Sequence, residues 1–417
     1  MTPDIIRLSP DVNALCVERI GVAKLTKLAF DSINLRPLWH ELMKEISDPA
    51  VGAGAAMDLS VIAQLLGDPK TGFAIQKQAL ARQRLYSSPC ASEDPKLRVL
   101  ALAAETDMGS NTPVEFLLED SDVELLTLYV VPGLALPEPL PEHDIAMVVV
   151  PDSDETRATL AEIDKLLPHW PRPVLNQPKK IAELDRDRFH ELLNTIAAIA
   201  IPMTARLSRE HLIEIGAGAK DLQDVLDDGV FPLIVRPVGS HAGRGLEKLE
   251  TRADIEPYLA DRPETEFFIS RFIDYRDRDD LYRKYRIVFI DGHPFACHMA
   301  ISDQWKIWYL NADMQQSPAK RAEEEKFMAE FDEGFAARHR AALAEIAQRV
   351  GLEYFAIDCA ETASGELLVF EGDNSAIVHN MDPPDIFPYK APQMRKLFDA
   401  FVAMLYRHAG RAQARAA

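Results

Sequence analysis

The sequence has few basic residues for its length, few cysteines and no long apolar run. Lysine and arginine number 46 against 66 aspartate and glutamate residues, which gives a net charge of −20. Because so acidic a chain repels a polyanion unless a local basic patch overrides the field, we expect no nucleic-acid partner. The four cysteines are scattered without a C-x-x-C pair, so they indicate neither a zinc site nor a disulfide framework. This cysteine usage favours a cytoplasmic location.

Features of targeting and of familiar catalytic motifs are also missing. No apolar run approaches the ~18 residues that span a membrane, and the N-terminus has no signal-peptide order, so we expect no membrane partner. No Ser-His or Cys-His arrangement typical of a protein nucleophile is recognisable. Because the chain has a large net negative charge, any anionic ligand must be held by local cations or a metal.

The length of 417 residues predicts more than one domain, at ~100–200 residues for each. Residues 1–90 read as helical, with one helix over 58–66, a break at 67–69 and a further helix over 72–86. This helical pair is reminiscent of tetratricopeptide packing. The turn-rich stretch 87–95 predicts a domain boundary.

Residues 96–175 alternate between strand and helix patterns. Strands are expected over 97–104, 123–131 and 145–150, and a helix over 155–167. This alternation predicts a small α/β domain with a mostly parallel sheet.

Residues 176–417 form the third predicted region, with a central part over about 203–275 and a C-terminal part over about 276–410. A helix is expected over 187–199, a solvated loop over 274–284, and a long helical region over 319–350. Asp291-Gly292 lies between two apolar runs, which predicts a hairpin of antiparallel strands.

A short apolar run over 231–235 ends at Arg236 and opens into a loop with Gly239, Gly243 and Gly245. Glycines let the backbone turn its N–H groups towards an anion at little steric cost, so this stretch predicts a strand followed by a phosphate-binding loop. The spacing fits neither G-x-G-x-x-G nor G-x-x-x-x-G-K-[ST]. A hairpin with three glycines is the alternative.

A second hairpin near the C-terminus places two carboxylates together. The strands over 354–358 and 367–371 end on Asp358 and Glu371 and flank a Ser-Gly turn. With an amide oxygen from Asn374, these carboxylates form a hard oxygen site that suits Mg²⁺ bound to nucleotide phosphates. A hairpin with polar ends is the alternative.

The chain thus contains, in order, a basic residue with a glycine-rich loop, the Asp-Gly hairpin and the hairpin with the two carboxylates. From about Leu97 to His379, this order of motifs resembles the ATP-grasp superfamily. The C-terminal half resembles the branch with glutathione synthetase and the ribosomal-protein glutamate ligase. The resemblance implies an ATP-grasp fold of mixed α+β and α/β class. It would contain a small α/β pre-ATP-grasp domain and two α+β subdomains clasping ATP, after an N-terminal helical domain that lies outside the resemblance.

The resemblance also implies site residues. It assigns the nucleotide to two arginines that occupy positions of family lysines, to the glycine-rich loop, and to the hinge segment over 269–273 that lines the adenine pocket in the family. It assigns the metal to the carboxylates of the C-terminal hairpin. The residues that would bind nucleotide are Arg186, Arg236, Gly239, Ser240, His241, Gly243, Gly245, Ile269, Ser270 and Arg271. Those for Mg²⁺, or Mn²⁺ as an alternative, are Asp358, Glu371, Asp373 and Asn374, and Arg286 would meet substrate or phosphate. Candidates for orienting the substrate in the mechanism that follows are His298, Asn311 and His379.

Three departures from the family pattern bear on activity. Arginine replaces lysine at 236, Ser270-Arg271 replaces a Gln-Glu pair, and Glu371-Gly-Asp373-Asn374 replaces Glu-x-Asn. The implied function is an ATP- and Mg²⁺-dependent ligase that joins a carboxylate to an amine, from small molecules or peptides, through an acyl phosphate. The alternatives are an ATP-dependent phosphotransferase and a degenerate nucleotide-binding interaction protein whose helical domain binds peptide. The sequence leaves a homo-oligomer open.

Overall fold

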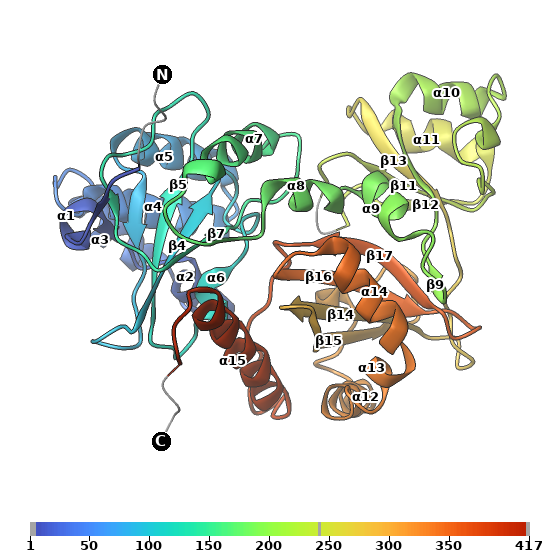
Figure 1. Cartoon of the computed structure of the whole chain (residues 1–417). Helices are drawn as coiled ribbons and strands as arrows, with labels where there is room; N and C mark the ends of the chain where they lie inside the picture. Colours follow the sequence, from blue (N-terminus) through green and yellow to red (C-terminus); the bar gives the residue numbers. More distant parts are fainter. Residues whose placement is uncertain (1–5, 241–242, 414–417) are drawn as a thin grey trace. The chain divides into compact units, whose positions relative to one another are not determined.

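A computed structural model describes residues 6–240 and 243–413 and divides the chain into two compact units (Figure 1). The first unit comprises the chain up to Ala182, Leu352–Phe355 and the chain from Asp373. The second comprises Glu183–Gly351 and Ala356–Gly372.

The first unit is built on a sheet with the strand order β2-β3-β5-β4-β7-β8. The pairs β2–β3, β4–β5, β4–β7 and β7–β8 are parallel, and β3 runs antiparallel to β5. Apart from Arg98, the residues of Leu97–Ala103 are apolar and buried, which suits a strand that is covered on both faces. The strands are β2 (Val17–Glu18), β3 (Leu85–Ser87), β4 (Leu97–Ala103), β5 (Val123–Tyr129), β7 (Ile145–Val148) and β8 (Val174–Leu175); β1 (Leu8–Ser9) and β6 (Leu140–Pro141) pair separately.

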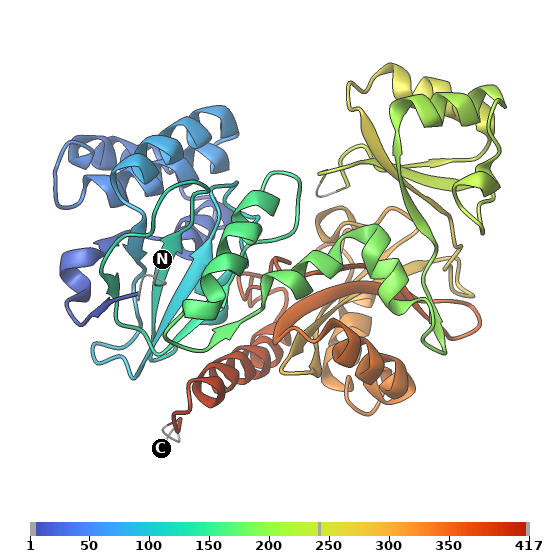
Figure 2. The ribbon, with the colours of Figure 1, turned by 45° about the horizontal axis from the view of Figure 1, so that its top comes forward.

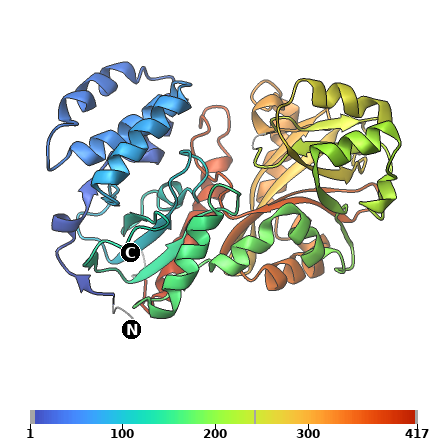
Figure 3. The ribbon, with the colours of Figure 1, turned by 90° about the horizontal axis from the view of Figure 1, so that it is seen from above.

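Helices of the first unit gather into a layer with its own apolar core, centred on Leu25, Leu59 and Ile62 (blue in Figure 3). Asp58 is buried in this layer at 2% exposure and accepts hydrogen bonds from the backbone N–H groups of Ile20 and Gly21 at 2.7 and 3.1 Å. The helices are α1 (Val12–Leu15), α2 (Val22–Phe30), α3 (Arg36–Glu45), α4 (Gly52–Leu65) and α5 (Pro69–Arg82).

The remaining helices of the first unit include the long C-terminal helix, dark red in Figure 2. This helix buries Leu397, Phe398 and Phe401 and contacts α6. The helices are α6 (Val114–Leu117), α7 (Arg157–Leu166), η1 (Leu167–His169), α8 (Pro178–Ile181) and α15 (Lys390–His408), and η2 (Ala182–Leu184) follows α8 at the junction of the units.

The predicted helix over 72–86 ends earlier than expected. Leu85 and Tyr86 are almost fully buried and pair with Leu128 and Thr127 of β5, so tertiary pairing makes residues 85–87 a strand. Because β2 and β3 precede residue 90 yet belong to the sheet of the following region, the expected boundary near 90 does not separate two compact units.

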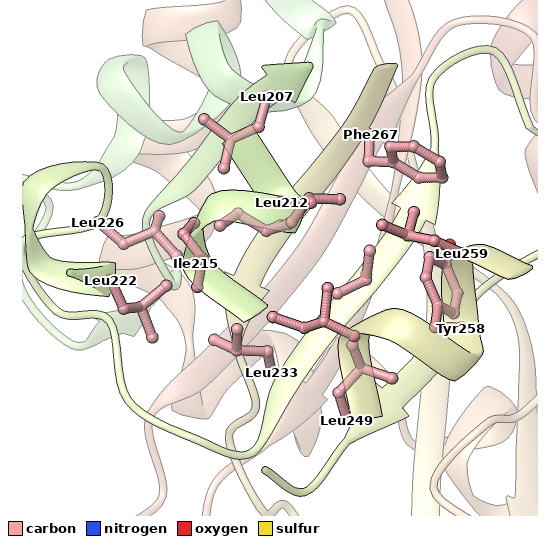
Figure 4. Packing of buried hydrophobic residues seen from close by; sticks show 13 residues of the cluster. Leu207, Leu212, Ile215, Leu222, Leu226, Leu233, Leu249, Tyr258, Leu259 and Phe267 are labelled. Atoms are coloured by element: carbon pink, nitrogen blue, oxygen red, sulfur yellow. The ribbon is translucent and has the colours of Figure 1, made fainter. Parts of the chain in front are cut away.

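The second unit contains a sheet with the order β10-β13-β11-β12, in which the pairs are antiparallel. Helices α10 and α11 supply Leu212, Ile215 and Tyr258 to a hydrophobic cluster with Leu233 and Phe267 of the sheet (Figure 4). The elements are β10 (Thr204–Ser208), α10 (Arg209–Ala217), η3 (Leu222–Asp224), β11 (Leu233–Pro237), β12 (Glu247–Leu249), η4 (Arg252–Asp254), α11 (Ile255–Ala260) and β13 (Glu266–Arg271).

The other sheet of the second unit has the order β15-β14-β16-β17-β9. Tyr285 on β14 packs against Phe327 and Phe335, which places one face of the sheet against helices. The strands are β9 (Ile199–Ala200), β14 (Tyr282–Ile290), β15 (His293–Ser302), β16 (Tyr354–Glu361) and β17 (Leu367–Asp373); the helices are α9 (Arg186–Leu193), η5 (Tyr309–Asn311), α12 (Pro318–Ala329), α13 (Phe335–Arg338) and α14 (Arg340–Val350).

The predicted fold class is confirmed: the chain combines a mostly parallel α/β sheet with antiparallel and mixed sheets covered by helices. The hairpins at Asp291-Gly292 and at 354–371 are also confirmed. Two local predictions were wrong. The helix over 187–199 stops at Leu193 because Ile199 and Ala200 pair with β17, and the loop over 274–284 gives way to β14 at Tyr282.

Candidate functional site

One face of the second sheet presents a row of polar side chains drawn from β15, β14, β16 and β17. His298 is the cross-strand partner of Arg286, and Arg286 contacts Asp358 on the next strand. Glu371 on β17 lies close enough to Asp358 for that charge to affect its ionisation. Since side chains alternate along a strand and Tyr285 faces the helices, Lys284 joins this row with Arg286.

Asp358 is a buried carboxylate held by two cations. Arg286 donates to both of its oxygens, at 2.8 Å to Oδ1 and 3.1 Å to Oδ2, and Lys284 Nζ lies 2.7 Å from Oδ2. Its side chain is 5% exposed. Burial opposes ionisation, but Arg286 and Lys284 outweigh it and hold the pKa of Asp358 well below its usual range. Asp358 is therefore a carboxylate at neutral pH.

Glu371 occupies the centre of a second charge cluster. Arg186, at the first turn of α9, donates to its carboxylate, and Arg236 Nη1 lies 3.9 Å from Oε2. Burial raises the pKa of Glu371, but Arg186, Lys284 and Arg236 outweigh burial and the repulsion of Asp358, so the pKa falls to about 2.

The glycine-rich loop follows β11, in which Arg236 is the last residue but one. The Arg236 guanidinium donates to the backbone oxygen of Ser240, and its Nε donates to Ser240 Oγ at 3.2 Å. Gly239, Gly243 and Gly245 all have positive φ angles, and a Cβ at Gly245 would lie 2.6 Å from Pro237 Cδ. Burial and the nearby Arg186 lower the pKa of Arg236. His241, also expected here, lies outside the described residues.

Several of these charged side chains line a pocket with a cavity volume of about 160 Å³. The charged part of its lining consists of Arg186, Arg236, Arg271, Lys284, Lys306 and Glu371. The larger part is apolar or aromatic and includes Ile201, Pro202, Ile234, Leu246, Phe268, Phe272, Ile273, Trp305, Leu368 and Phe370. A lining that combines apolar and aromatic surface with cations suits a ligand with a flat hydrophobic body and an anionic tail.

The predicted hinge residues divide between the pocket and the interior. Ser270 and Arg271 line the pocket, and Arg271 Nε also donates to Asp228 at 2.6 Å. Ile269 is 1% exposed within the hydrophobic cluster, because alternate side chains of β13 face opposite sides. The Ile269 side chain therefore does not line this pocket, and its assignment to the nucleotide stays a prediction.

The remaining predicted substrate residues have local partners. The ring of His298 lies 4.8 Å from that of Tyr309, whose hydroxyl donates to buried Glu324 at 3.0 Å. Asn311 is exposed, and its Oδ1 accepts the N–H of Trp308 at 2.9 Å, so this side chain caps its own turn. His379 lies in the first unit, near Phe30.

Of the four predicted metal ligands, Asp358 and Glu371 belong to the second unit, whereas Asp373 and Asn374 belong to the first. Asn374 is 2% exposed and donates to the carbonyl of Val150 at 3.1 Å, and Asp373 Oδ1 accepts the Ser375 N–H at 2.6 Å. Within residues 6–240 and 243–413, no group of three or more His, Cys, Asp and Glu side chains is arranged to hold a metal ion.

Sequence reasoning gave no role to two cations that line the pocket, Lys284 and Lys306. Lys284 stands two positions before Arg286, so strand alternation alone would have placed it on the same face. Lys306 Nζ donates to the Leu246 carbonyl at 2.7 Å, which joins its segment to the end of the glycine-rich loop.

Comparison with known proteins gives structural likeness only. No protein-family model and no curated protein matches the chain. The solved structures it resembles include a RimK-domain ATP-grasp protein from Sphaerobacter thermophilus (20% identity, TM-score 0.41, 75% of this chain and 99% of that one). They also include a D-alanine–D-alanine ligase from Bacillus anthracis complexed with ATP (14%, 0.44, 76% and 100%) and the ATP-grasp ligase PsnB with a precursor peptide and AMPPNP (16%, 0.40, 75% and 99%). The likeness is partial at these TM-scores.

In the described part of the chain, every helix is too short or too polar to cross a membrane.

Proposed function

We propose that the chain is an ATP- and Mg²⁺-dependent ligase that joins a carboxylate to an amine, from amino acids or peptides, through an acyl phosphate. The observation that supports this most directly is the pocket itself, whose lining combines apolar and aromatic surface with cationic side chains. An adenine ring fits the first by stacking and burial, and a triphosphate fits the second.

The charge of the site matches such a ligand. Arg186, Arg236, Lys284 and Arg286 surround Asp358 and Glu371, so four cations face two carboxylates and leave an excess of two positive charges. A nucleoside triphosphate with one divalent ion is a net anion of about two charges. The site is thus close to electrical balance with this ligand bound, although the chain as a whole is acidic.

The donor atoms of Asp358 and Glu371 suit a magnesium ion that is bound together with a nucleotide. Asp358 and Glu371 offer only carboxylate oxygens, and Mg²⁺ in nucleotide sites is commonly bound through one or two carboxylates plus substrate phosphates. In this proposal Asp358 and Glu371 hold the ion, whose chemistry is to neutralise charge on the phosphates. Asp373 or Asn374 stays a predicted third donor.

In the proposed reaction, a carboxylate oxygen of the substrate attacks the γ-phosphorus of ATP and ADP leaves. The amine nitrogen then attacks the acyl carbon, phosphate leaves and the nitrogen loses a proton. Arg186, Arg236 and Arg286 stabilise the charge that develops on the phosphoryl oxygens, and no protein nucleophile is needed. His298, beside Arg286 on the same face, orients the substrate.

The test is ADP release with ATP and Mg²⁺ against mixtures of amino acids and peptides, with products identified by mass spectrometry. We expect substrate-dependent ADP and a product whose mass equals that of acid plus amine less water. Glu371→Gln should abolish turnover, whereas Glu361→Gln is a matched control because Glu361 binds Arg338 and His339 away from the pocket. A stable phosphorylated product would indicate phosphoryl transfer instead. Nucleotide binding without substrate-dependent ADP would contradict the ligase.

A further inference from the structure

Lys284 is the cation of the site that the proposed reaction leaves without a role. Its side chain lines the pocket and is 25% exposed, while the carboxylate with which it pairs is 5% exposed. One side of the ammonium group thus meets a buried partner, and the rest of the side chain reaches the space that a ligand would fill.

The contact with Asp358 does not need Lys284 for charge neutrality. Arg286 already makes a two-pronged contact with both oxygens of Asp358, which is the strongest geometry available to an arginine and a carboxylate. Lys284 adds a second positive charge to the same Oδ2. The pair of cations around one carboxylate therefore has one positive charge in excess, and this excess lies at the pocket wall.

The two cations also differ in how readily they move. The Arg286 fork is planar and fixed by two parallel contacts, whereas Lys284 is a point charge on a flexible stem with three donors. A divalent ion on Asp358 would repel both cations, and the lysine can swing away at the lower cost. The other nearby anion, Glu371, is already bound by Arg186, so the ligand phosphates are the anion left for the lysine.

We propose that Lys284 is an exchangeable counter-ion: it pairs with Asp358 in the free protein and turns to the phosphates of the nucleotide when ligand binds. This inference rests on the proposed function, because it takes the ligand to be a nucleoside triphosphate. It adds a residue that selects for phosphate number, which none of the sequence motifs indicated.

The test is calorimetric titration of the full chain with AMPPNP, ADP and adenosine in the presence of Mg²⁺, with adenosine measured by competition. Lys284→Met should weaken AMPPNP binding by about 10- to 100-fold, the usual effect of losing a hydrogen bond to a charged group. The loss should be smaller for ADP and within about twofold for adenosine. Lys284→Arg should restore most of the AMPPNP affinity because it keeps the charge.

Arg283→Met is the matched control. Arg283 is the neighbouring residue on β14, carries the same charge and also binds carboxylates, but its partners Asp279 and Glu323 lie away from the pocket. We expect it to bind AMPPNP within about twofold of wild type. Thermal unfolding without ligand shows whether each variant folds.

The outcomes separate this inference from the proposed function. Wild-type protein that binds no AMPPNP would overturn both. Wild-type binding with an unchanged Lys284→Met variant would overturn the role of Lys284 alone. Equal weakening by Lys284→Met and Arg283→Met, or equal loss for adenosine and AMPPNP, would show that Lys284 only supports the strand and would overturn it too.

Discussion

Replacing Lys284 and Arg286 together should destabilise the second unit by more than the two single replacements combined. Both side chains contact Asp358, which is 5% exposed and ionised. Either cation alone still neutralises that carboxylate. Only the double replacement, Lys284→Met with Arg286→Met, leaves a buried charge without a partner.

The expected magnitudes follow from this redundancy. Each single replacement removes one charge-assisted contact while the other remains, and should cost about 1 kcal/mol of unfolding free energy. Removing all partners of a buried charge typically costs about 3–5 kcal/mol. The double variant should thus exceed the sum of the singles by about 1–3 kcal/mol, a coupling of the size found for residues that share one network.

The coupling is measured by the urea dependence of amide hydrogen exchange in peptides covering β16, because a chain of two compact units need not unfold in a single step. The same changes are made in an Asp358→Asn background as the control. There the coupling should disappear, since no carboxylate needs neutralising. An additive double variant, or equal coupling in both backgrounds, would refute the view that Asp358 is shared by two interchangeable cations.

Three further predictions concern other positions. Burial raises the pKa of Asp58 to about 6, so the folded state binds a proton more readily than the unfolded state. On lowering the pH from about 7.5 to 5, the free energy of urea unfolding of wild type should therefore rise by about 1.4 kcal/mol relative to that of Asp58→Asn. A difference between the two proteins that does not change with pH would contradict this. Gly372→Ala should lower the free energy of unfolding by about 1–3 kcal/mol, because the added Cβ would lie 2.6 Å from Cζ of buried Phe189. It should also weaken AMPPNP binding, because Phe189 lies on the helix that begins with Arg186. Unchanged thermal unfolding would show that Phe189 moves to make room. Arg236→Ala should weaken AMPPNP binding about tenfold or more, and Arg236→Lys should recover only part of it if the fork matters; full recovery in titration would assign the effect to charge alone.

The parts of the fold that were predictable are those in which local pattern and tertiary structure agree. The apolar run at Leu97–Ala103 and the turn at Asp291-Gly292 specify strand and hairpin without reference to the rest of the chain. The short strands Leu85–Ser87 and Ile199–Ala200 were missed because each follows a helical pattern and becomes a strand only through pairing with β5 or β17. Two or three residues have no periodicity of their own to detect.

The site shows the same division. Asp358 and Glu371 lie on the two strands of one hairpin, so pairing those strands was enough to expect them together, whereas Arg286 was expected only from the family resemblance. Lys284 was missed because it follows a dense run of charges that was read as one solvated loop, although β14 already begins at Tyr282. Ile269 points into the hydrophobic cluster because helices cover that side of β13, and no local sequence pattern shows which side of the strand the helices cover.

The path of the chain between its two units limits how the protein can be divided. The chain leaves the first unit after Ala182, returns for Leu352–Phe355, leaves again and comes back at Asp373. Strand β16 therefore starts in one unit and reaches Asp358 in the other. No single cut yields a complete unit: a fragment ending at residue 182 lacks α15, and one starting at 183 includes it without its sheet. Excision of residues 183–372 would remove the second unit, but it would also remove Leu352–Phe355 of the first, so functional dissection of this protein requires an internal deletion or point substitutions rather than a truncation.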